Sequence, residues 1–202
     1  MSEASSPLRI GVLALQGGFA AHQSVLAGLG ALTSEVRRPA DLNGLDAIVL
    51  PGGESTTISI GLASSGLGDG IRDFAGNGGP VLGTCAGLIL CDDSHLGLCD
   101  ITARRNAYGR QLQSFEADLT VAGLGDEPLR AVFIRSPRLE RLGDEVEVLA
   151  SRRGEPVAVR QGGVLATAFH PELTEDPRFH ALFMAIATAA SERGRVAGEA
   201  TR

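Results

Sequence analysis

Lysine is absent from this chain of 202 residues, because all 18 of its positively charged side chains are arginine. A P-loop nucleotide site needs the lysine of its motif, and protein kinases need a lysine on a strand. Schiff-base formation and lysine general bases need an amine that can lose its proton, whereas the arginine guanidinium stays protonated in proteins. Any chemistry in this chain must therefore come from other side chains.

Other residue types that are rare or absent exclude further classes of protein. Tryptophan is absent, Tyr108 is the single tyrosine, and the three cysteines have no repeated spacing, which argues against both stacking platforms and a disulfide framework. The net charge is −6 and basic residues cluster only in pairs, so nucleic-acid binding is not expected. Apolar runs fall far short of the ~20 residues of a membrane span, and residues 1–7 lack a signal-peptide core. We expect a cytoplasmic protein.

The residues that are abundant indicate a globular α/β domain. Hydrophobic residues make up 44% of the chain, and its length suits a single domain over residues 1–202, with flexible tails at 1–7 and about 191–202. Apolar runs and helical spacing predict strands that alternate with helices in the first half: strands 8–15, 34–37, 47–50 and 80–83, and helices 19–29, 57–63 and 67–75. This alternation predicts a parallel sheet with helices on both faces.

The second half has a different pattern. Shorter, more antiparallel strands are predicted at 114–120, 131–134, 146–150, 156–160 and 164–169, and a closing helix at 179–190. The whole chain therefore predicts a three-layer α/β/α fold around a mixed, mostly parallel central sheet.

One pentapeptide, Gly83-Thr84-Cys85-Ala86-Gly87, follows a predicted buried strand and precedes an apolar helical start. This is the pattern of a nucleophile elbow with cysteine as the nucleophile. So sharp a turn crowds its flanks, which explains the two glycines, and the helix N-terminus favours a thiolate. The amide of Ala86 can donate to an oxyanion. The alternative is a small buried cysteine that only packs.

A thiol nucleophile needs a base, and the sequence offers His170 directly after a predicted strand, with Glu172 two residues later. In extended backbone, residues i and i+2 point to the same side, so the carboxylate can hold one imidazole nitrogen. Alone, this pattern would indicate a loop histidine near a helix start. The glycines of Pro51-Gly52-Gly53-Glu54-Ser55 also follow a strand and can aim N–H groups at developing charge, although taken alone they favour a plain strand-to-helix turn.

The remaining histidines and cysteines have simpler interpretations. Cys91, His95 and Cys99 have a spacing that could place three zinc ligands on one helical face, but Gly97 and the lack of a fourth ligand argue against a metal site. His22 and His180 are interpreted as histidines of amphipathic helices without a chemical role.

Several strings, in this order, resemble class I, triad-type glutamine amidotransferases, and most closely the glutaminase subunits of pyridoxal 5′-phosphate synthases. The resemblance extends from about Leu8 to about Ala187, and the matching strings are Gly11–Leu13, Leu15–Gly17, Pro51–Thr57, Gly83–Leu88, Arg105-Asn106, Gly109–Gln111, Ser114–Leu119, Phe133–Pro137 and Phe169–Asp176. It implies a flavodoxin-like core. It also implies hydrolysis of L-glutamine to L-glutamate and ammonia.

The resemblance implies roles for particular residues. Cys85 would form a γ-glutamyl thioester, His170 would transfer protons, and Glu172 would hold the imidazole. The backbone N–H groups of Gly53 and Ala86 would form the oxyanion hole. The residues that would line the glutamine pocket are Gly53, Glu54, Ser55, Arg105, Ile134 and Arg135. No cofactor and no metal are implied.

The resemblance also implies a partner. The ammonia would pass to a synthase (lyase) subunit that makes pyridoxal 5′-phosphate, vitamin B6, from ribose 5-phosphate and glyceraldehyde 3-phosphate, within a large hetero-oligomer. Gln16, in the loop after the first strand, would couple docking of that partner to the oxyanion hole.

One departure from the family pattern leaves alternatives open. The stretch between Cys85 and Arg105 is shorter than is usual, so the helix behind the nucleophile is expected to be truncated. Two other functions remain possible on these residues: a glutaminase subunit of another amidotransferase, such as an imidazole glycerol phosphate or purine precursor synthase, and a non-catalytic docking module.

Overall fold

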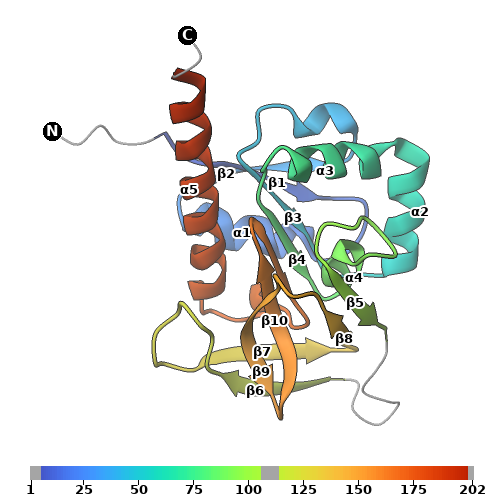
Figure 1. Ribbon diagram of the computed structural model, residues 1–202, viewed down its shortest axis with the longest axis vertical. Helices are drawn as coiled ribbons and strands as arrows, with labels where there is room; N and C mark the ends of the chain where they lie inside the picture. Colours follow the sequence, from blue (N-terminus) through green and yellow to red (C-terminus); the bar gives the residue numbers. More distant parts are fainter. Residues whose placement is uncertain (1–5, 106–113, 200–202) are drawn as a thin grey trace, which may run out of the picture.

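The computed structural model describes residues 6–105 and 114–199, and a mixed seven-stranded sheet forms its centre (Figure 1). The strand order is β2-β1-β3-β4-β11-β10-β9. The first five of these strands are parallel to their neighbours, whereas β10 is antiparallel to both β11 and β9. The strands are β1 (Arg9–Leu13), β2 (Leu32–Val36), β3 (Ala47–Leu50), β4 (Val81–Thr84), β9 (Glu147–Arg152), β10 (Glu155–Gln161) and β11 (Val164–Thr167).

Helices cover both faces of this sheet. Helices α1 (Phe19–Gly28) and α5 (Arg178–Glu199) lie together on one side, and α2 (Ser55–Ser65), α3 (Leu67–Gly76) and α4 (Ala86–Cys91) lie on the other (Figure 1). Two short 3₁₀ helices, η1 (Pro39–Leu42) and η2 (Pro171–Leu173), lie in the connections. The predicted three-layer arrangement with a mixed, mostly parallel sheet is confirmed.

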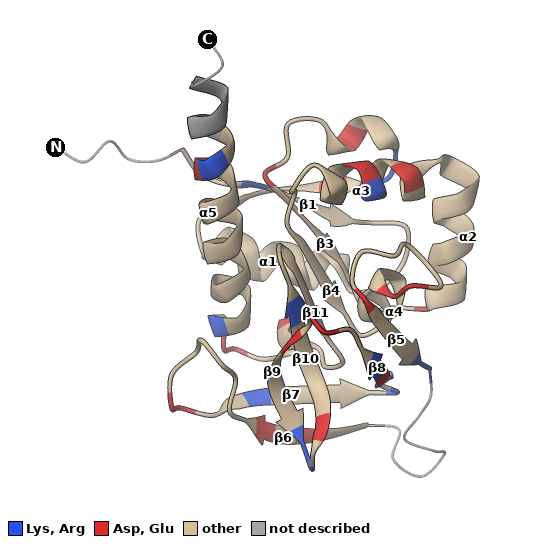
Figure 2. Ribbon diagram, viewed as in Figure 1, with Lys and Arg blue, Asp and Glu red and all other residues tan. Residues whose placement is uncertain are grey.

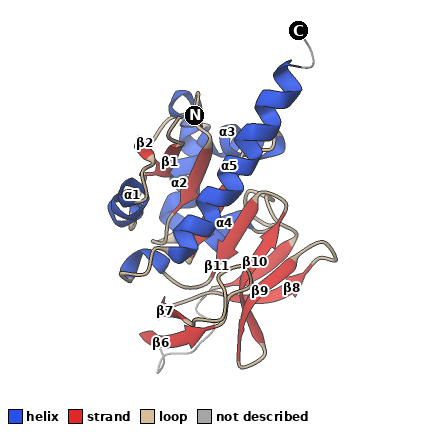
Figure 3. Cartoon of the chain, turned by 90° about the vertical axis from the view of Figure 1, so that its left-hand side faces the viewer, coloured by secondary structure: helices blue, strands red, loops and turns tan. Residues whose placement is uncertain are grey.

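Two small antiparallel sheets accompany the central one, β5 (Ile101–Arg104) with β8 (Arg138–Leu142) and β6 (Ser114–Leu119) with β7 (Leu129–Ile134). The β6–β7 pair forms the end of the molecule opposite the C-terminus (Figure 3). Figure 2 shows positive charge on β7 beside negative charge on β6, where Arg130 pairs with Glu116 and Asp118. Strands β5 and β8 were not predicted, because each has only four or five residues and its pairing partner lies far away in the sequence.

The closing helix is longer than predicted. Helix α5 extends from Arg178 to Glu199, past residue 190, where the closing helix was predicted to end. Residues 191–199 contain no proline, and most of them are compatible with a helix, so nothing local ends it. Residues 1–5 and 200–202, also expected in tails, lie outside the described part of the chain.

Aromatic packing fixes the end of β11 against α5. The ring of Phe169 lies 5.8 Å from that of Phe133 and 5.2 Å from that of Phe179, edge to face in both cases, and all three side chains are buried. The next residue, His170, donates its backbone N–H to the carbonyl oxygen of Val132 at 2.8 Å. These contacts hold the backbone of His170 between β7 and the α5 layer.

The topology brings four loops to one edge of the sheet. Strands β1, β3, β4 and β11 are parallel, so the loops that follow their carboxyl ends meet there. Those loops carry Gln16, Gly53, Cys85 and His170. Open α/β sheets place ligand sites at this edge, where the strand order changes direction.

Candidate functional site

A cavity of about 360 Å³ opens at this edge of the sheet. It brings together every candidate residue from the sequence except Glu172, which lies behind His170. Its lining consists of Gln16, Gly53, Glu54, Ser55, Thr56, Cys85, Ala86, Ile89, Arg105, Ile134, Arg135 and His170. Thr56 and Ile89 also line it, although neither was among the residues expected in the glutamine pocket.

Cys85 occupies a strained turn between β4 and α4. Its backbone angles are φ 51° and ψ −102°, an unfavourable conformation for a residue with a Cβ atom. A Cβ atom at Gly87 would lie 1.8 Å from the carbonyl oxygen of Leu50, and one at Gly83 would lie 2.7 Å from the carbonyl oxygen of Gly87. Both flanking positions therefore require glycine, as the elbow pattern predicts.

Helix α4 behind the elbow contains only six residues, in line with the short stretch between Cys85 and Arg105. The chain leaves the helix at Asp92 in an extended conformation. The favourable effect of a helix N-terminus arises mainly in its first turn, which α4 retains. The shortening therefore removes later turns without removing the N–H groups at Ala86 and Gly87.

His170 and Glu172 are hydrogen bonded, with 2.7 Å between His170 Nδ1 and Glu172 Oε1. Burial lowers the pKa of His170, but interactions with Cys85 and Glu172 outweigh it and raise this pKa to about 10. Burial raises the pKa of Glu172, yet the hydrogen bond with His170 and the nearby His22 leave it lowered overall. The Glu172 carboxylate is thus held ionised against the imidazole. The Cys85 thiol lies 3.8 Å from the carbonyl oxygen of Ile134.

The glycine loop after β3 is locked against the loop after β1. The carbonyl oxygen of Gly52 accepts a hydrogen bond from the N–H of Gly18 at 3.0 Å. In a trans peptide the C=O and N–H point in opposite directions, so the N–H of Gly53 points away from the β1 loop. A Cβ atom at Gly52 would lie 2.5 Å from Cε1 of His170, which shows how closely the loop approaches the imidazole.

Two arginines, Arg105 and Arg135, also line the cavity. Nη1 of Arg105 donates to Oγ1 of Thr56 at 2.6 Å and to Oγ of Ser55 at 3.2 Å, at the first turn of α2. Arg135 has a positive φ of 44°, which is rare for a residue with a side chain. Asn106 and Gly109–Gln111, which belong to the resembling strings, lie outside the described residues.

Sequence patterns missed three polar residues behind Glu172. His22 on α1 and His180 on α5 lie on helices, as expected, but both are fully buried and hydrogen bonded to each other, and Thr84 completes the cluster. One signal was present in the sequence. His22 lies one helical turn before the buried Leu26, on the face that packs against the sheet.

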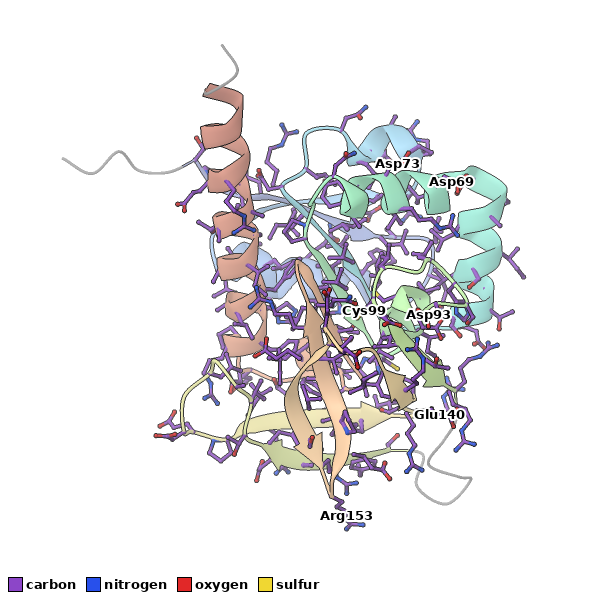
Figure 4. The ribbon with its side chains drawn as sticks, viewed as in Figure 1. Asp69, Asp73, Asp93, Cys99, Glu140 and Arg153 are labelled. Carbon is purple, nitrogen blue, oxygen red and sulfur yellow. The ribbon has the colours of Figure 1, made fainter. Side chains whose placement is uncertain are left out.

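Cys91, His95 and Cys99 have contacts of their own near α4. Burial raises the pKa of both thiols, to about 12 for Cys99, whereas zinc binds the thiolate. His95 Nδ1 lies 2.7 Å from Oδ1 of Asp92. Figure 4 labels Cys99 and Asp93 in the segment that joins α4 to β5. Within residues 6–105 and 114–199, no three His, Cys, Asp or Glu side chains are grouped as a metal site would require.

None of the helices in the described ranges combines the length and apolar character that crossing a bilayer needs.

Comparisons with known proteins agree with one another. A model of the SNO glutamine amidotransferase family matches residues 12–188. The chain is 52% identical over 189 residues to the pyridoxal 5′-phosphate synthase subunit PdxT of Roseiflexus sp. (strain RS-1), a match that covers 89% of this chain and 100% of that protein. Identity is also 52% over 188 residues to the subunit of the same name from Mycobacteroides abscessus, with 89% and 96% covered. A crystal structure of a glutamine amidotransferase has 47% identity and a TM-score of 0.83, covering 89% of this chain and 98% of that one.

Proposed function

The chain belongs to the SNO glutamine amidotransferase family, and from that premise we propose that it hydrolyses L-glutamine as the glutaminase subunit of a pyridoxal 5′-phosphate synthase. The observation that carries the proposal is the cavity in which Cys85 and His170 meet, with Glu172 bonded to the imidazole from behind. A thiol, an oriented imidazole and a buried carboxylate are the parts that acyl transfer from an amide requires.

The reaction starts at Cys85. Its thiol proton passes to Nε2 of His170, the nitrogen left free by the bond between Nδ1 and Glu172. The thiolate attacks the side-chain carbonyl carbon of glutamine, and the carbonyl oxygen becomes an oxyanion. When the C–N bond breaks, His170 gives its proton to the leaving amine, which departs as ammonia and leaves a γ-glutamyl thioester.

Water completes the cycle. His170 takes a proton from the water as its oxygen attacks the thioester carbonyl. The C–S bond then breaks, L-glutamate leaves, and the proton returns to the sulfur. The raised pKa of His170 suits the steps in which the imidazole carries the proton, because Glu172 stabilises the imidazolium.

Backbone N–H groups stabilise the oxyanion. The amide of Ala86 follows the nucleophile directly, at the first residue of α4, and the amide of Gly53 belongs to the loop opposite. Both residues line the cavity with Cys85. Preorganised donors of this kind act where charge develops and are worth roughly 3–4 kcal/mol each.

The remaining polar lining recognises the amino-acid end of glutamine. The guanidinium groups of Arg105 and Arg135 suit the α-carboxylate, because their planar forks can bind both oxygens. The carboxylate of Glu54 suits the α-ammonium group. Ser55 and Ile134 complete the wall on either side.

The ammonia goes to a synthase subunit. The subunits PdxT similar to this chain are named as parts of pyridoxal 5′-phosphate synthase, which supports the same role here. Building pyridoxal phosphate from phosphosugars needs amines that form imines, and this chain has no lysine side chain to offer. Imine chemistry therefore belongs to the partner, and we place the complex in the cytoplasm.

Glutamine hydrolysis measured with and without the synthase subunit tests the proposal. We expect ammonia release that rises on mixing the two subunits, and labelling of Cys85 by a glutamine-analogue electrophile that the Cys85→Ala variant lacks. Stimulation by a different synthase would instead favour another amidotransferase. No labelling with the partner present would favour a non-catalytic docking module, for which the short α4 is the one supporting feature.

A further inference from the structure

A buried row of side chains stands behind Glu172, on the side away from His170. Nε2 of His22 lies 3.3 Å from Oε2 of Glu172, and Nδ1 of His22 lies 2.9 Å from Nε2 of His180. The two histidines are fully buried, and they come from α1 and α5, which lie side by side on this face of the sheet (Figure 1). The proposed reaction as described above does not use either histidine.

One oxygen of the Glu172 carboxylate, Oε2, faces this row of side chains. Its Oε1 is bonded to Nδ1 of His170. Its Oε2 is buried and has no hydrogen-bond partner among the described residues, and Nε2 of His22, at 3.3 Å, lies close to it without meeting hydrogen-bond geometry. A buried carboxylate oxygen without a donor is costly, and a donor at this position is therefore worth more than at the surface.

Two arrangements of hydrogens are possible in the histidine pair. In the first, Nε2 of His22 carries the hydrogen, which it donates to Oγ1 of Thr84 while facing Oε2 of Glu172, and Nδ1 accepts from Nε2 of His180. In the second, Nδ1 of His22 donates to His180, and Nε2 presents a lone pair to the Glu172 carboxylate. The second arrangement sets two acceptors 3.3 Å apart. It also places a buried N–H on Nδ1 of His180, an atom with no partner among the described residues.

The first arrangement leaves only a lone pair on Nδ1 of His180 without a partner, which costs less than an orphaned N–H. Thr84 fits it as well. Its Oγ1 lies 3.1 Å from Nε2 of His22 and accepts from the backbone N–H of Gly52 at 3.1 Å, so it can share the same His22 hydrogen. The donor count therefore selects the tautomer with hydrogen on Nε2.

Burial keeps both histidines of the row neutral. Glu172 and His170 are the ionisable groups that face His22 besides His180. Burial lowers the pKa of His22 to about 4 in spite of the attraction of Glu172, and it lowers the pKa of His180 to about 3. At neutral pH, His22 is thus a neutral donor, and the full charge of Glu172 remains directed at His170.

We infer that His22 is a positioning residue for Glu172, which it supports through the 3.3 Å contact of its protonated Nε2 with Oε2, and that His180 fixes the required tautomer. The inference rests on the proposed function, since it assigns the support of the same carboxylate. Without the donor, Glu172 loses the contact that keeps Oε1 against Nδ1 of His170. The imidazolium is then less stabilised, and the Cys85 thiolate forms at higher pH.

Two amides at position 22 separate this role from packing. Glutamine is long enough to put its amide nitrogen near the place of Nε2, whereas asparagine ends near the place of Nδ1. His22→Gln can therefore still donate to Glu172, and His22→Asn cannot. The full chain, mixed with its synthase subunit, is assayed for kcat and KM of ammonia release. The pH dependence of Cys85 alkylation by iodoacetamide is measured in parallel, together with thermal stability.

We expect His22→Asn to lower kcat roughly ten- to a hundredfold, the range typical of groups that orient a functional histidine through a neighbour. KM should stay unchanged, because His22 does not line the cavity. The alkylation midpoint should shift to higher pH. His22→Gln should recover most of kcat, and His95→Asn, the same change at a histidine outside the cavity lining, should leave kcat, KM and the alkylation midpoint unchanged.

The inference is wrong if His22→Asn and His22→Gln have the same kcat for ammonia release. This holds when both values match the wild type, and also when both fall in proportion to the loss of thermal stability. The same comparison can be made with His180→Gln and His180→Asn, because His180 contacts His22 and not Glu172. If His22→Asn does not fold, this second pair of variants tests the inference. The alkylation readout does not depend on glutamine turnover. A wild-type chain that shows no ammonia release therefore counts against the proposed function alone.

Discussion

The side-chain oxygen of Gln16 accepts a hydrogen bond from the backbone N–H of Glu54 at 2.6 Å. This bond connects the loop after β1 with the N-cap of α2, whose first turn lines the cavity. The same oxygen would lie 2.5 Å from a Cβ atom at Gly53, so the amide of Gln16 rests directly on the glycine proposed for the oxyanion hole. A movement of the β1 loop therefore reaches that glycine through a single side chain.

Removal of this bond tests the proposed coupling role. We expect Gln16→Ala to lower partner-stimulated ammonia release about tenfold while unfolding free energy falls by only about 1 kcal/mol, the typical worth of one hydrogen bond. Gln161→Ala is the matched control, because Gln161 Oε1 also accepts from a backbone N–H, that of Asp100 at 2.7 Å, away from the cavity. Unchanged stimulation in Gln16→Ala would show that Gln16 has no part in coupling.

The elbow depends on the absence of a side chain at Gly87. We expect Gly87→Ala to destabilise the chain by several kcal/mol or to prevent folding, because its Cβ would lie 1.8 Å from the carbonyl oxygen of Leu50. Gly28→Ala provides the control, since no atom lies within 4 Å of a Cβ at that helical position. Thermal melting should show the loss only at Gly87, and a similar melting temperature for both variants would contradict the packing argument.

The buried histidines should make the chain sensitive to acid. A histidine whose pKa is lowered on folding takes up protons more readily when unfolded, so stability falls as pH falls from about 6.5 towards the folded value. For His22, with a pKa of about 4, the loss over this window is about 3 kcal/mol at most, and His180 acts in the same direction. Urea unfolding at pH 7 and pH 5 measures this.

The lowered pKa of Glu172 adds a further loss below about pH 4.5, whereas His170, with its raised pKa, acts in the opposite sense and loses its contribution between about pH 6.5 and 10. His22→Gln should show a shallower slope between pH 7 and pH 5 than the wild type, since one titrating group is gone. Equal stability at pH 7 and pH 5 in the wild type would rule out neutral, buried histidines.

Arg135 combines backbone strain with a position in the cavity. Replacing it with glycine should relieve the cost of its φ of 44°, on the order of 1 kcal/mol, while removing a guanidinium from the glutamine pocket. We therefore expect Arg135→Gly to raise KM for glutamine at least tenfold with little loss of stability.

The control for Arg135 is Arg153→Gly. Arg153 has a φ of 51°, lies at the tip of the β9–β10 hairpin (Figure 4), and does not line the cavity. Both variants should change the unfolding free energy by a similar amount, but only Arg135→Gly should raise KM for glutamine. An unchanged KM would remove Arg135 from the proposed pocket.

Much of the central fold was predictable because local patterns fix local geometry. Apolar runs closed by glycine or proline located β1, β3 and β4, and the Gly83–Gly87 string located the elbow. The polar strands β5 and β8 were missed, because their pairing depends on neighbours distant in the chain rather than on their own alternation. The end of α5 was misplaced, because no residue between 191 and 199 is a strong breaker.

In the candidate site, too, some features follow from local sequence and others depend on tertiary packing. The sequence by itself determined that Cys85, His170, Gly53 and Gln16 follow strands, and the carboxyl ends of parallel strands must meet. Only the tertiary structure decided what stands behind Glu172. His22 and His180 are 158 positions apart, and neither has a local pattern that names its partner. The contact exists because two helices pack side by side on one face of the sheet, where a buried carboxylate oxygen needs a donor.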